Sequence, residues 1–154
     1  MSLTVGAAAP DFQLESTDGP VSMRGLRGSR VILYFYPKDD TPGCTREACS
    51  FRDSMQRLAG HGAVVLGVSK DSVASHNRFR EKYGLTFPLA SDPDNKTATA
   101  YGAFGPKSMY GKKVMGTIRS TFVIDAKGKI EQIWSPVKVD GHVDQILAAL
   151  TDSV

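Results

Sequence analysis

Two stretches of consecutive apolar residues dominate the pattern of the chain. Residues 31–36 (VILYFY) and 64–69 (VVLGVS) are rich in β-branched and aromatic side chains, and polar residues do not alternate with them. Such runs are typical of strands that are buried on both faces of a sheet. We therefore expect two central strands, the first of which ends before Pro37.

An amphipathic helix is expected after each of these strands. The first helix has apolar residues at three- and four-residue steps, namely Ala48, Phe51, Met55 and Leu58. Thr41 and Pro42 suit its N-cap and its first position, and Gly60 is expected to end it. The second helix is expected over residues 73–83, with Ser72 as its N-cap.

Shorter elements are expected in the rest of the chain. They are short edge strands and loops over residues 1–30, one or two helical turns over 96–101, a long surface loop over 102–117, a hairpin of strands 121–125 and 130–134, and an amphipathic helix around 143–150.

Strand–helix–strand units imply parallel pairing, and the hairpin adds antiparallel strands. This order indicates an α/β, thioredoxin-like fold: a central mixed sheet flanked by helices, with an N-terminal β-rich extension. We expect one domain over residues 1–154.

Composition and charge narrow the class of protein. The net charge is only +3, and the 19 basic residues are spread along the whole chain, so nucleic-acid binding has little support. No apolar stretch approaches the roughly 18 residues of a membrane span, and the first residues lack the pattern of a secretory signal. We expect a cytoplasmic protein without a membrane partner. In that compartment two cysteines are more often redox-active or inert than a structural disulfide.

Both cysteines lie at the expected start of the first helix. With Thr41 as N-cap, Cys44 falls at the third helical position, among backbone N–H groups that have no partner within the helix. The partial positive charge there favours the thiolate over the thiol. Cys44 also lies one turn before Ala48 on the apolar stripe, so we expect it at the floor of a pocket. The alternative is a buried, inert cysteine.

Ionisation alone does not make a fast thiol enzyme. A thiol of ordinary acidity is about 3% ionised near neutral pH, so full ionisation gains at most about thirtyfold in rate. The rest must come from donors that stabilise the transition state. The Thr41 hydroxyl and the Arg119 guanidinium are the candidates. N-capping alone would explain Thr41, and an arginine such as Arg119 is more often a solvated surface charge.

Cys49 cannot reach Cys44 while the helix is intact. Five residues of α-helix turn the chain by roughly 140° and place the two Cα atoms about 8 to 9 Å apart. A disulfide needs a Cα separation of about 4.4 to 6.8 Å. A bond between the two sulfurs would therefore require the first turns of the helix to unwind. The alternative is a pair of unrelated buried thiols.

These residues resemble a known family. Pro37, Thr41 and Cys44 match the Pro-x-x-x-Thr-x-x-Cys signature of peroxiredoxins. Residues 41–53, and further along residues 109–116 and 119–125, resemble the peroxiredoxin Q group, which is also called the bacterioferritin comigratory proteins. The similarity covers nearly the whole chain. It implies a thioredoxin-fold peroxidase that serves antioxidant defence and cell redox homeostasis and needs no metal or other cofactor.

The resemblance also implies a role for each matched residue. Cys44 would be the peroxidatic cysteine, which attacks hydrogen peroxide or an organic hydroperoxide and becomes a sulfenic acid. Pro37 would shield the pocket. Thr41 and Arg119 would hold and polarise the peroxide oxygens, and Glu47 would orient Arg119.

Cys49 matches the resolving cysteine of members with a Cys-x-x-x-x-Cys pair. It would form an intramolecular disulfide with Cys44, which thioredoxin or a glutaredoxin-like dithiol donor reduces. Other members carry the resolving cysteine on the next helix, but residues 72–83 contain none here. Because resolution can be internal, we expect a monomer.

Two other functions compete with this interpretation. A thioredoxin-type oxidoreductase would be expected to show Cys-x-x-Cys at the helix start, whereas this chain has Cys-x-x-x-x-Cys preceded by Thr41. A binding module could use a basic cluster for an acidic partner, although a solvated loop explains that cluster better; its members are Lys107, Lys112, Lys113 and Arg119. Metal binding has no support, because the histidines show no ligand spacing with the cysteines; they are His61, His76 and His142.

Overall fold

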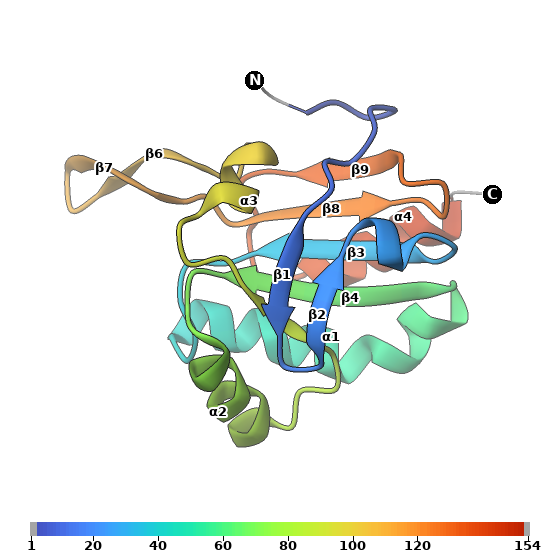
Figure 1. Cartoon of the computed structure of the whole chain (residues 1–154), viewed down its shortest axis with the longest axis horizontal. Helices are drawn as coiled ribbons and strands as arrows, with labels where there is room; N and C mark the ends of the chain where they lie inside the picture. The colour runs from blue at the N-terminus through green and yellow to red at the C-terminus, as the bar shows by residue number, and fades with distance from the viewer. Residues whose placement is uncertain (1–2, 153–154) are drawn as a thin grey trace.

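The computed structural model describes residues 3–152, and a seven-stranded sheet forms its centre (Figure 1). In sheet order the strands are β2 (Gly19–Ser22), β1 (Gln13–Ser16), β5 (Leu89–Ser91), β4 (Ala63–Ser69), β3 (Arg30–Phe35), β8 (Ser120–Ile124) and β9 (Ile130–Trp134). The helices are α1 (Pro42–Gly60), α2 (Val73–Tyr83), α3 (Lys96–Ala100) and α4 (His142–Asp152), with a short 3-10 helix over Arg24–Leu26.

The two long apolar runs form the neighbouring strands β3 and β4, as predicted. They pair in parallel, with Val31 opposite Val64, and β3 pairs antiparallel with β8 on its other side. β4 continues in parallel to β5, whereas β8 and β9 form the expected antiparallel hairpin. The sheet is therefore mixed, and the thioredoxin-like arrangement of the fold is confirmed.

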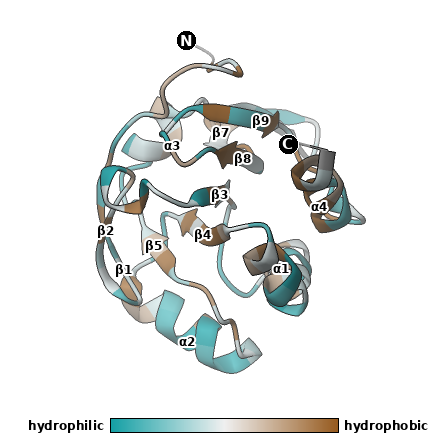
Figure 2. Ribbon diagram, turned by 90° about the vertical axis from the view of Figure 1, so that its right-hand side faces the viewer, coloured by the Kyte–Doolittle hydropathy of each residue, from teal (hydrophilic) through white to brown (hydrophobic). Residues whose placement is uncertain are grey.

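Successive side chains of β3 enter two different cores, which explains why the run has no polar alternation. Ile32 and Tyr34 belong to the core beneath α1, α2 and α4. Val31, Leu33 and Phe35 belong to the core on the opposite face. That second face is covered by the N-terminal segment, the 3-10 helix and α3, and Figure 2 shows α1 and α4 together on the other side of the sheet.

The helix ends follow from local chemistry. The Ser72 hydroxyl accepts a hydrogen bond from the Ser75 N–H, as predicted, and Gly84 caps the end of α2 with a φ of 61°. α1 ends at Gly60, as predicted, and is capped by His61. The left-handed residue that turns the chain into β4 is Gly62, with a φ of 72°.

The prediction of a long surface loop over residues 102–117 is wrong. The segment forms a separate antiparallel hairpin of β6 (Phe104–Met109) and β7 (Lys112–Thr117), which projects from the body of the molecule (Figure 1). Tyr110 and Gly111 make the two-residue turn, with φ values of 52° and 78°. Much of the hairpin lies in solvent, so its sequence lacks the alternation that marks a half-buried strand.

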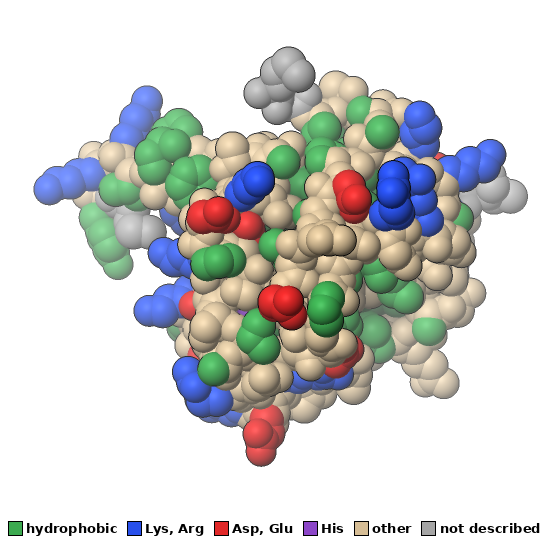
Figure 3. Space-filling view, in the orientation of Figure 1, with side chains coloured by type: hydrophobic (Ala, Val, Ile, Leu, Met, Phe, Trp, Pro, Cys, Tyr) green, Lys and Arg blue, Asp and Glu red, His purple; other side chains and the backbone are tan. Residues whose placement is uncertain are grey.

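The hairpin carries exposed apolar and basic side chains together. Figure 3 shows green and blue side chains mixed at this end of the molecule. Tyr110 is 98% exposed and Met115 is 64% exposed, and Lys112 and Lys113 are exposed beside them. Within residues 3–152, no helix is long and apolar enough to cross a lipid bilayer.

Candidate active site

The start of α1 places Cys44 where the sequence predicts it. Thr41 is the N-cap, with an extended backbone, and Pro42 is the first helical residue, so Cys44 is the third. The Cys44 side chain is 2% exposed and belongs to the core beneath α1, in line with Ala48 and Phe51. The thiol therefore lies at the sheet-facing side of the helix start and not on an open surface.

Thr41 does not act as a capping side chain. Its hydroxyl makes no bond to the first turn of α1 and instead donates to the Lys38 carbonyl at 3.0 Å. N-capping therefore does not explain this threonine. The N–H groups of Gly43 and Cys44, at the second and third helical positions, have no acceptor within the helix. They contribute partial positive charge beside the thiol and suit a bound anion.

Arg119 is a partner of Cys44 and not a solvated charge. It lies between β7 and β8, where its Nη2 donates to Cys44 Sγ at 3.3 Å and its Nη1 donates to Glu47 Oε1 at 2.7 Å. Burial works against its charge, but the negative charges of Glu47 and of a Cys44 thiolate, with the two hydrogen bonds, raise the pKa of Arg119. Gly43 leaves room for this contact, because a Cβ there would lie 3.2 Å from Nη2.

Glu47 lies under the site, one turn after Cys44, and is 1% exposed. One carboxylate oxygen binds Arg119, whereas the other has no hydrogen-bond partner among the described residues. Burial raises the pKa of Glu47 to about 7, although the charge and hydrogen bond of Arg119 lower it. The Tyr34 hydroxyl, on the same face of the sheet, is the other buried polar atom without a partner in the described part of the chain.

Cys49 differs from Cys44 in its surroundings. Both cysteines are free thiols, but Cys49 is partly exposed. α1 runs without a break from Pro42 to Gly60 and includes both of them. In the thiol state the helix therefore keeps the two sulfurs on different sides of its axis, beyond the reach of a disulfide.

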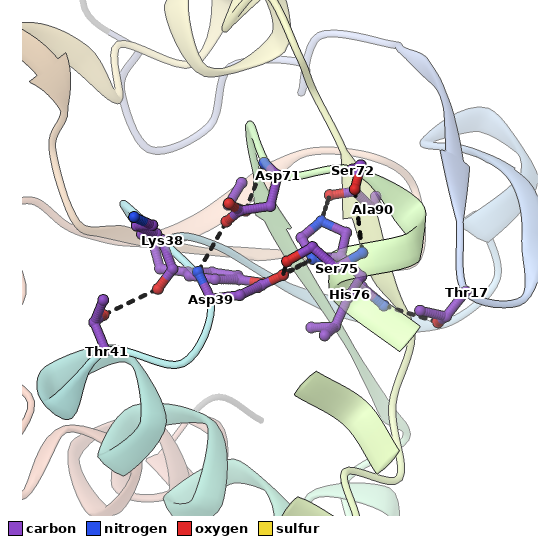
Figure 4. Close-up of polar contacts among 12 residues, drawn as sticks. Thr17, Lys38, Asp39, Thr41, Asp71, Ser72, Ser75, His76 and Ala90 are labelled. Atoms are coloured by element: carbon purple, nitrogen blue, oxygen red, sulfur yellow. Dashed lines mark hydrogen bonds and ion pairs between the residues drawn. The ribbon is translucent and has the colours of Figure 1, made fainter. Parts of the chain in front are cut away.

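A buried polar cluster beside the site was missed by sequence reasoning. Asp39, in the loop between β3 and α1, is hydrogen-bonded to Ser75 and His76 (Figure 4). It also accepts a hydrogen bond from the Tyr36 hydroxyl. Ser75 and His76 lie on α2, more than thirty residues further along the chain. The only available signal was the position of His76 on the apolar side of that helix. Pro37, at the other end of the same loop, is half-buried.

The arrangement suits nucleophilic chemistry by sulfur. A buried sulfur lies next to a fixed cation and at a helix N-terminus, an arrangement that is typical of nucleophilic cysteines. The guanidinium that contacts sulfur can also reach an atom that the sulfur attacks. Within residues 3–152, no group of side chains has the composition of a metal site.

Comparisons with known proteins agree with this chemistry. The model of the AhpC/TSA family matches residues 5–133. A putative peroxiredoxin bcp of Coxiella burnetii is 52% identical over 151 residues, which cover 97% of this chain and 100% of that protein. Peroxiredoxin Bcp of Bacillus subtilis is 44% identical over 153 residues, which cover 99% of this chain and 98% of that protein.

Solved structures give the same result. A structure of the Xanthomonas campestris bacterioferritin comigratory protein, described for its alkyl peroxide reduction activity, superposes with a TM-score of 0.89. It is 43% identical, and the match covers 98% of this chain and 97% of that one. A peroxiredoxin Q mutant of Xylella fastidiosa gives a TM-score of 0.92 at 35% identity, over 99% of this chain and 98% of that one.

Proposed function

The chain belongs to the AhpC/TSA family, among its Bcp/peroxiredoxin Q peroxiredoxins, and on this premise we propose that Cys44 is the residue that reduces the peroxide. Peroxiredoxins are thiol-dependent peroxidases, so the protein is an oxidoreductase that acts on hydroperoxides with a thiol reductant. The assignment of the residue rests on one observation: the Arg119 guanidinium lies 3.3 Å from the buried sulfur of Cys44 at a helix N-terminus.

The first step is a two-electron oxidation of sulfur. The Cys44 thiolate attacks the terminal oxygen of the hydroperoxide, and a sulfur–oxygen bond forms as the oxygen–oxygen bond breaks. The electron pair of that bond leaves with the second oxygen, which takes a proton from solvent and departs as water or an alcohol. Cys44 is left as a sulfenic acid.

Thr41 and Arg119 hold the peroxide in this proposal. The Thr41 hydroxyl already donates its hydrogen to the Lys38 carbonyl, so its oxygen is free to accept a hydrogen bond from the O–H of the peroxide. Arg119 donates to the sulfur and would donate to the oxygens on which negative charge develops. Glu47 fixes the direction of the guanidinium through its 2.7 Å bond. Pro37 shields the pocket from water.

Cys49 is proposed to resolve the sulfenic acid. Once the first turns of α1 unwind, the Cys49 thiolate attacks the sulfur of Cys44, a disulfide forms, and the sulfur–oxygen bond breaks. The hydroxide that leaves takes a proton and becomes water. Thioredoxin or a glutaredoxin-like donor then gives two electrons and two protons, restores both thiols and becomes a disulfide itself.

The remaining features of the proposal follow from this cycle. A monomer is sufficient, because both cysteines lie in one helix of one chain. A cytoplasmic location suits a cycle that depends on a reducing dithiol. Hydrogen peroxide and organic hydroperoxides are both proposed as substrates, and the alkyl peroxide activity of the Xanthomonas relative supports the second class.

Mass analysis under non-reducing conditions tests the proposal. After one equivalent of peroxide, the wild-type protein should lose two hydrogens and yield one peptide in which Cys44 and Cys49 are linked. Cys49→Ser should instead gain one oxygen, trapped at Cys44 with a sulfenic-acid reagent, and lose most thioredoxin-coupled turnover. Cys44→Ser should not consume peroxide. Peroxide-dependent turnover by Cys44→Ser would disprove the assignment, and full coupled turnover by Cys49→Ser would disprove the resolving role.

A further inference from the structure

The Asp39 carboxylate is buried and holds three hydrogen bonds. Its Oδ1 accepts from the Tyr36 hydroxyl at 2.5 Å, and its Oδ2 accepts from the Ser75 hydroxyl at 2.8 Å and binds His76 Nδ1 at 2.7 Å. The side chains of Asp39 and His76 are 3% and 0% exposed. Figure 4 shows Asp39 reaching from the loop before α1 toward Ser75 and His76 on α2.

His76 is held at both ring nitrogens. Its Nε2 lies 2.9 Å from the Ala90 carbonyl on β5, which can only accept, so this nitrogen carries a hydrogen. Its Nδ1 lies 2.7 Å from Asp39 Oδ2. The imidazole ring is therefore fixed between the loop and the sheet, and it fixes the Asp39 carboxylate in turn.

The main chain of Asp39 is held as well. Its N–H donates to Asp71 Oδ2 at 2.8 Å, and the Ser69 hydroxyl fixes the same oxygen at 2.7 Å. Ser69 is the last residue of β4, and Asp71 lies two residues further on. The side chain of Asp39 thus joins the loop to α2, and the main-chain N–H of Asp39 joins the loop to the end of β4. The groups that make these contacts are buried or half-buried.

We call these side-chain and main-chain contacts of Asp39 the clamp. In sequence, Asp39 lies between Lys38 and Thr41, and the Thr41 hydroxyl donates to the Lys38 carbonyl. Cys44 follows Thr41 by one turn, in α1. Rotation of the loop at Asp39 would move the Lys38 carbonyl, the acceptor that orients the Thr41 hydroxyl. Burying an acid–histidine pair costs desolvation free energy, and a pair of apolar side chains would stabilise the fold at least as well. What the polar pair adds is a single defined geometry for the loop.

We propose that Asp39 is a positioning residue for the peroxide step: clamped by Ser75 and His76, it fixes the loop so that the Thr41 hydroxyl and the Cys44 sulfur face the same peroxide. This inference rests on the proposed roles of Cys44 and Thr41. It makes α2, which supplies no reacting atom, a determinant of the rate at which peroxide oxidises Cys44.

Two rate constants measured in a Cys49→Ser parent test the clamp. One is for oxidation of Cys44 by hydrogen peroxide, which needs Thr41 in place. The other is for alkylation of Cys44 by iodoacetamide, which needs only an accessible thiolate. Asp39→Ala should lower the first by roughly tenfold or more and change the second by no more than about twofold, because misplacing one group by about 1 Å has costs of this size.

Two further variants separate positioning from stability. Asp39→Asn keeps hydrogen bonds to Tyr36 and His76, so the peroxide rate should return to within roughly threefold of the parent. Asp40→Asn is the matched control: the next residue also contacts α2, through Lys82 at 2.8 Å and Tyr83 at 2.7 Å, but these contacts are exposed, so both rates should stay within about twofold.

The outcomes are distinct. If Asp39→Ala does not fold, Ser75→Ala removes one donor and leaves the acid paired, and the peroxide rate should fall by roughly two- to fourfold with alkylation unchanged. Folded variants with equal losses in both rates, or with no loss, would overturn the clamp. A parent that peroxide does not oxidise at Cys44 would overturn the assignment of Cys44 itself, and the clamp with it.

Discussion

Glu47 shows how a single side chain shapes this site. It is buried beneath Cys44, and one of its oxygens directs Arg119 while the other has no partner among the described residues. Its proximity to Arg119 favours the carboxylate, but burial is the larger effect and raises its pKa to about 7. Near neutral pH the site therefore contains a carboxyl group that is close to half ionised.

Glu47 should make the stability of the folded protein fall as the pH rises. The pKa is 4.5 for an ordinary glutamate and about 7 in the folded state, so the folded state binds the proton more tightly. The resulting stability is fully present below about pH 4.5 and is lost as the pH rises to about 7. Urea unfolding of wild type and Glu47→Gln across this range should show the variant gaining relative stability with pH, by at most about 1.4 kcal/mol per pH unit. A constant difference between the two proteins would contradict the shift.

For single residues, the sequence predicted positions set by near neighbours well and contacts between distant residues poorly. Cys44 lies at the helix position predicted from Thr41 and Pro42, because capping and the apolar stripe are local patterns. The contact of Arg119 with Cys44 was expected only in outline, since it joins residues 75 positions apart. Asp39 was missed altogether, because an aspartate in a loop shows no periodicity and its partners lie on another helix.

At the scale of elements, burial decided what the sequence could predict. β3, β4, α1 and α2 were recognised because one or both of their faces enter a core and leave an apolar pattern. β6 and β7 were missed because their hairpin projects from the sheet and pairs only with itself. α1 ends at Gly60, as predicted, although the left-handed turn into β4 is made by Gly62, the second of two nearby glycines.

α1 is the element that should change during the cycle. Oxidation to a Cys44–Cys49 disulfide requires its first turns to open, whereas the clamp at Asp39 holds the preceding loop. Hydrogen exchange should therefore become faster for the amides of residues 45–49 in the oxidised protein and stay slow in β3 and in the later turns of α1. The reduced protein is the control. Unchanged protection over residues 45–49 in a protein shown to carry the disulfide would contradict the unwinding.

At the scale of the whole molecule, two cores on opposite faces of one sheet support the site. The core beneath α1 contains Cys44, and α4 packs against the same core beside α1. His142 begins α4 and is buried there, with its Nε2 2.8 Å from the Thr121 hydroxyl and its ring edge-on to Trp134. Burial lowers the pKa of His142 to about 4, and the charge of Arg119 adds to this effect.

His142 should weaken the fold on acidification, opposite in sign to Glu47. Its pKa is lower in the folded state, about 4, than the ordinary 6.5, so the stability it contributes is present above about pH 6.5 and is lost as the pH falls to about 4. His142→Gln keeps a donor for Thr121 and cannot become charged. Thermal unfolding midpoints should show wild type losing stability relative to this variant over that range. Parallel pH profiles would refute the shift.

The unbroken start of α1 also bears on how readily the enzyme is regenerated. A disulfide between Cys44 and Cys49 would enclose only four residues and would hold open turns that are helical in the thiol form. Reducing it lets those turns reform, and their folding free energy adds to the driving force of electron transfer. The dithiol is thereby favoured and the reduction potential of the pair is raised. If this disulfide forms, a dithiol of ordinary reducing strength would be enough to complete the cycle.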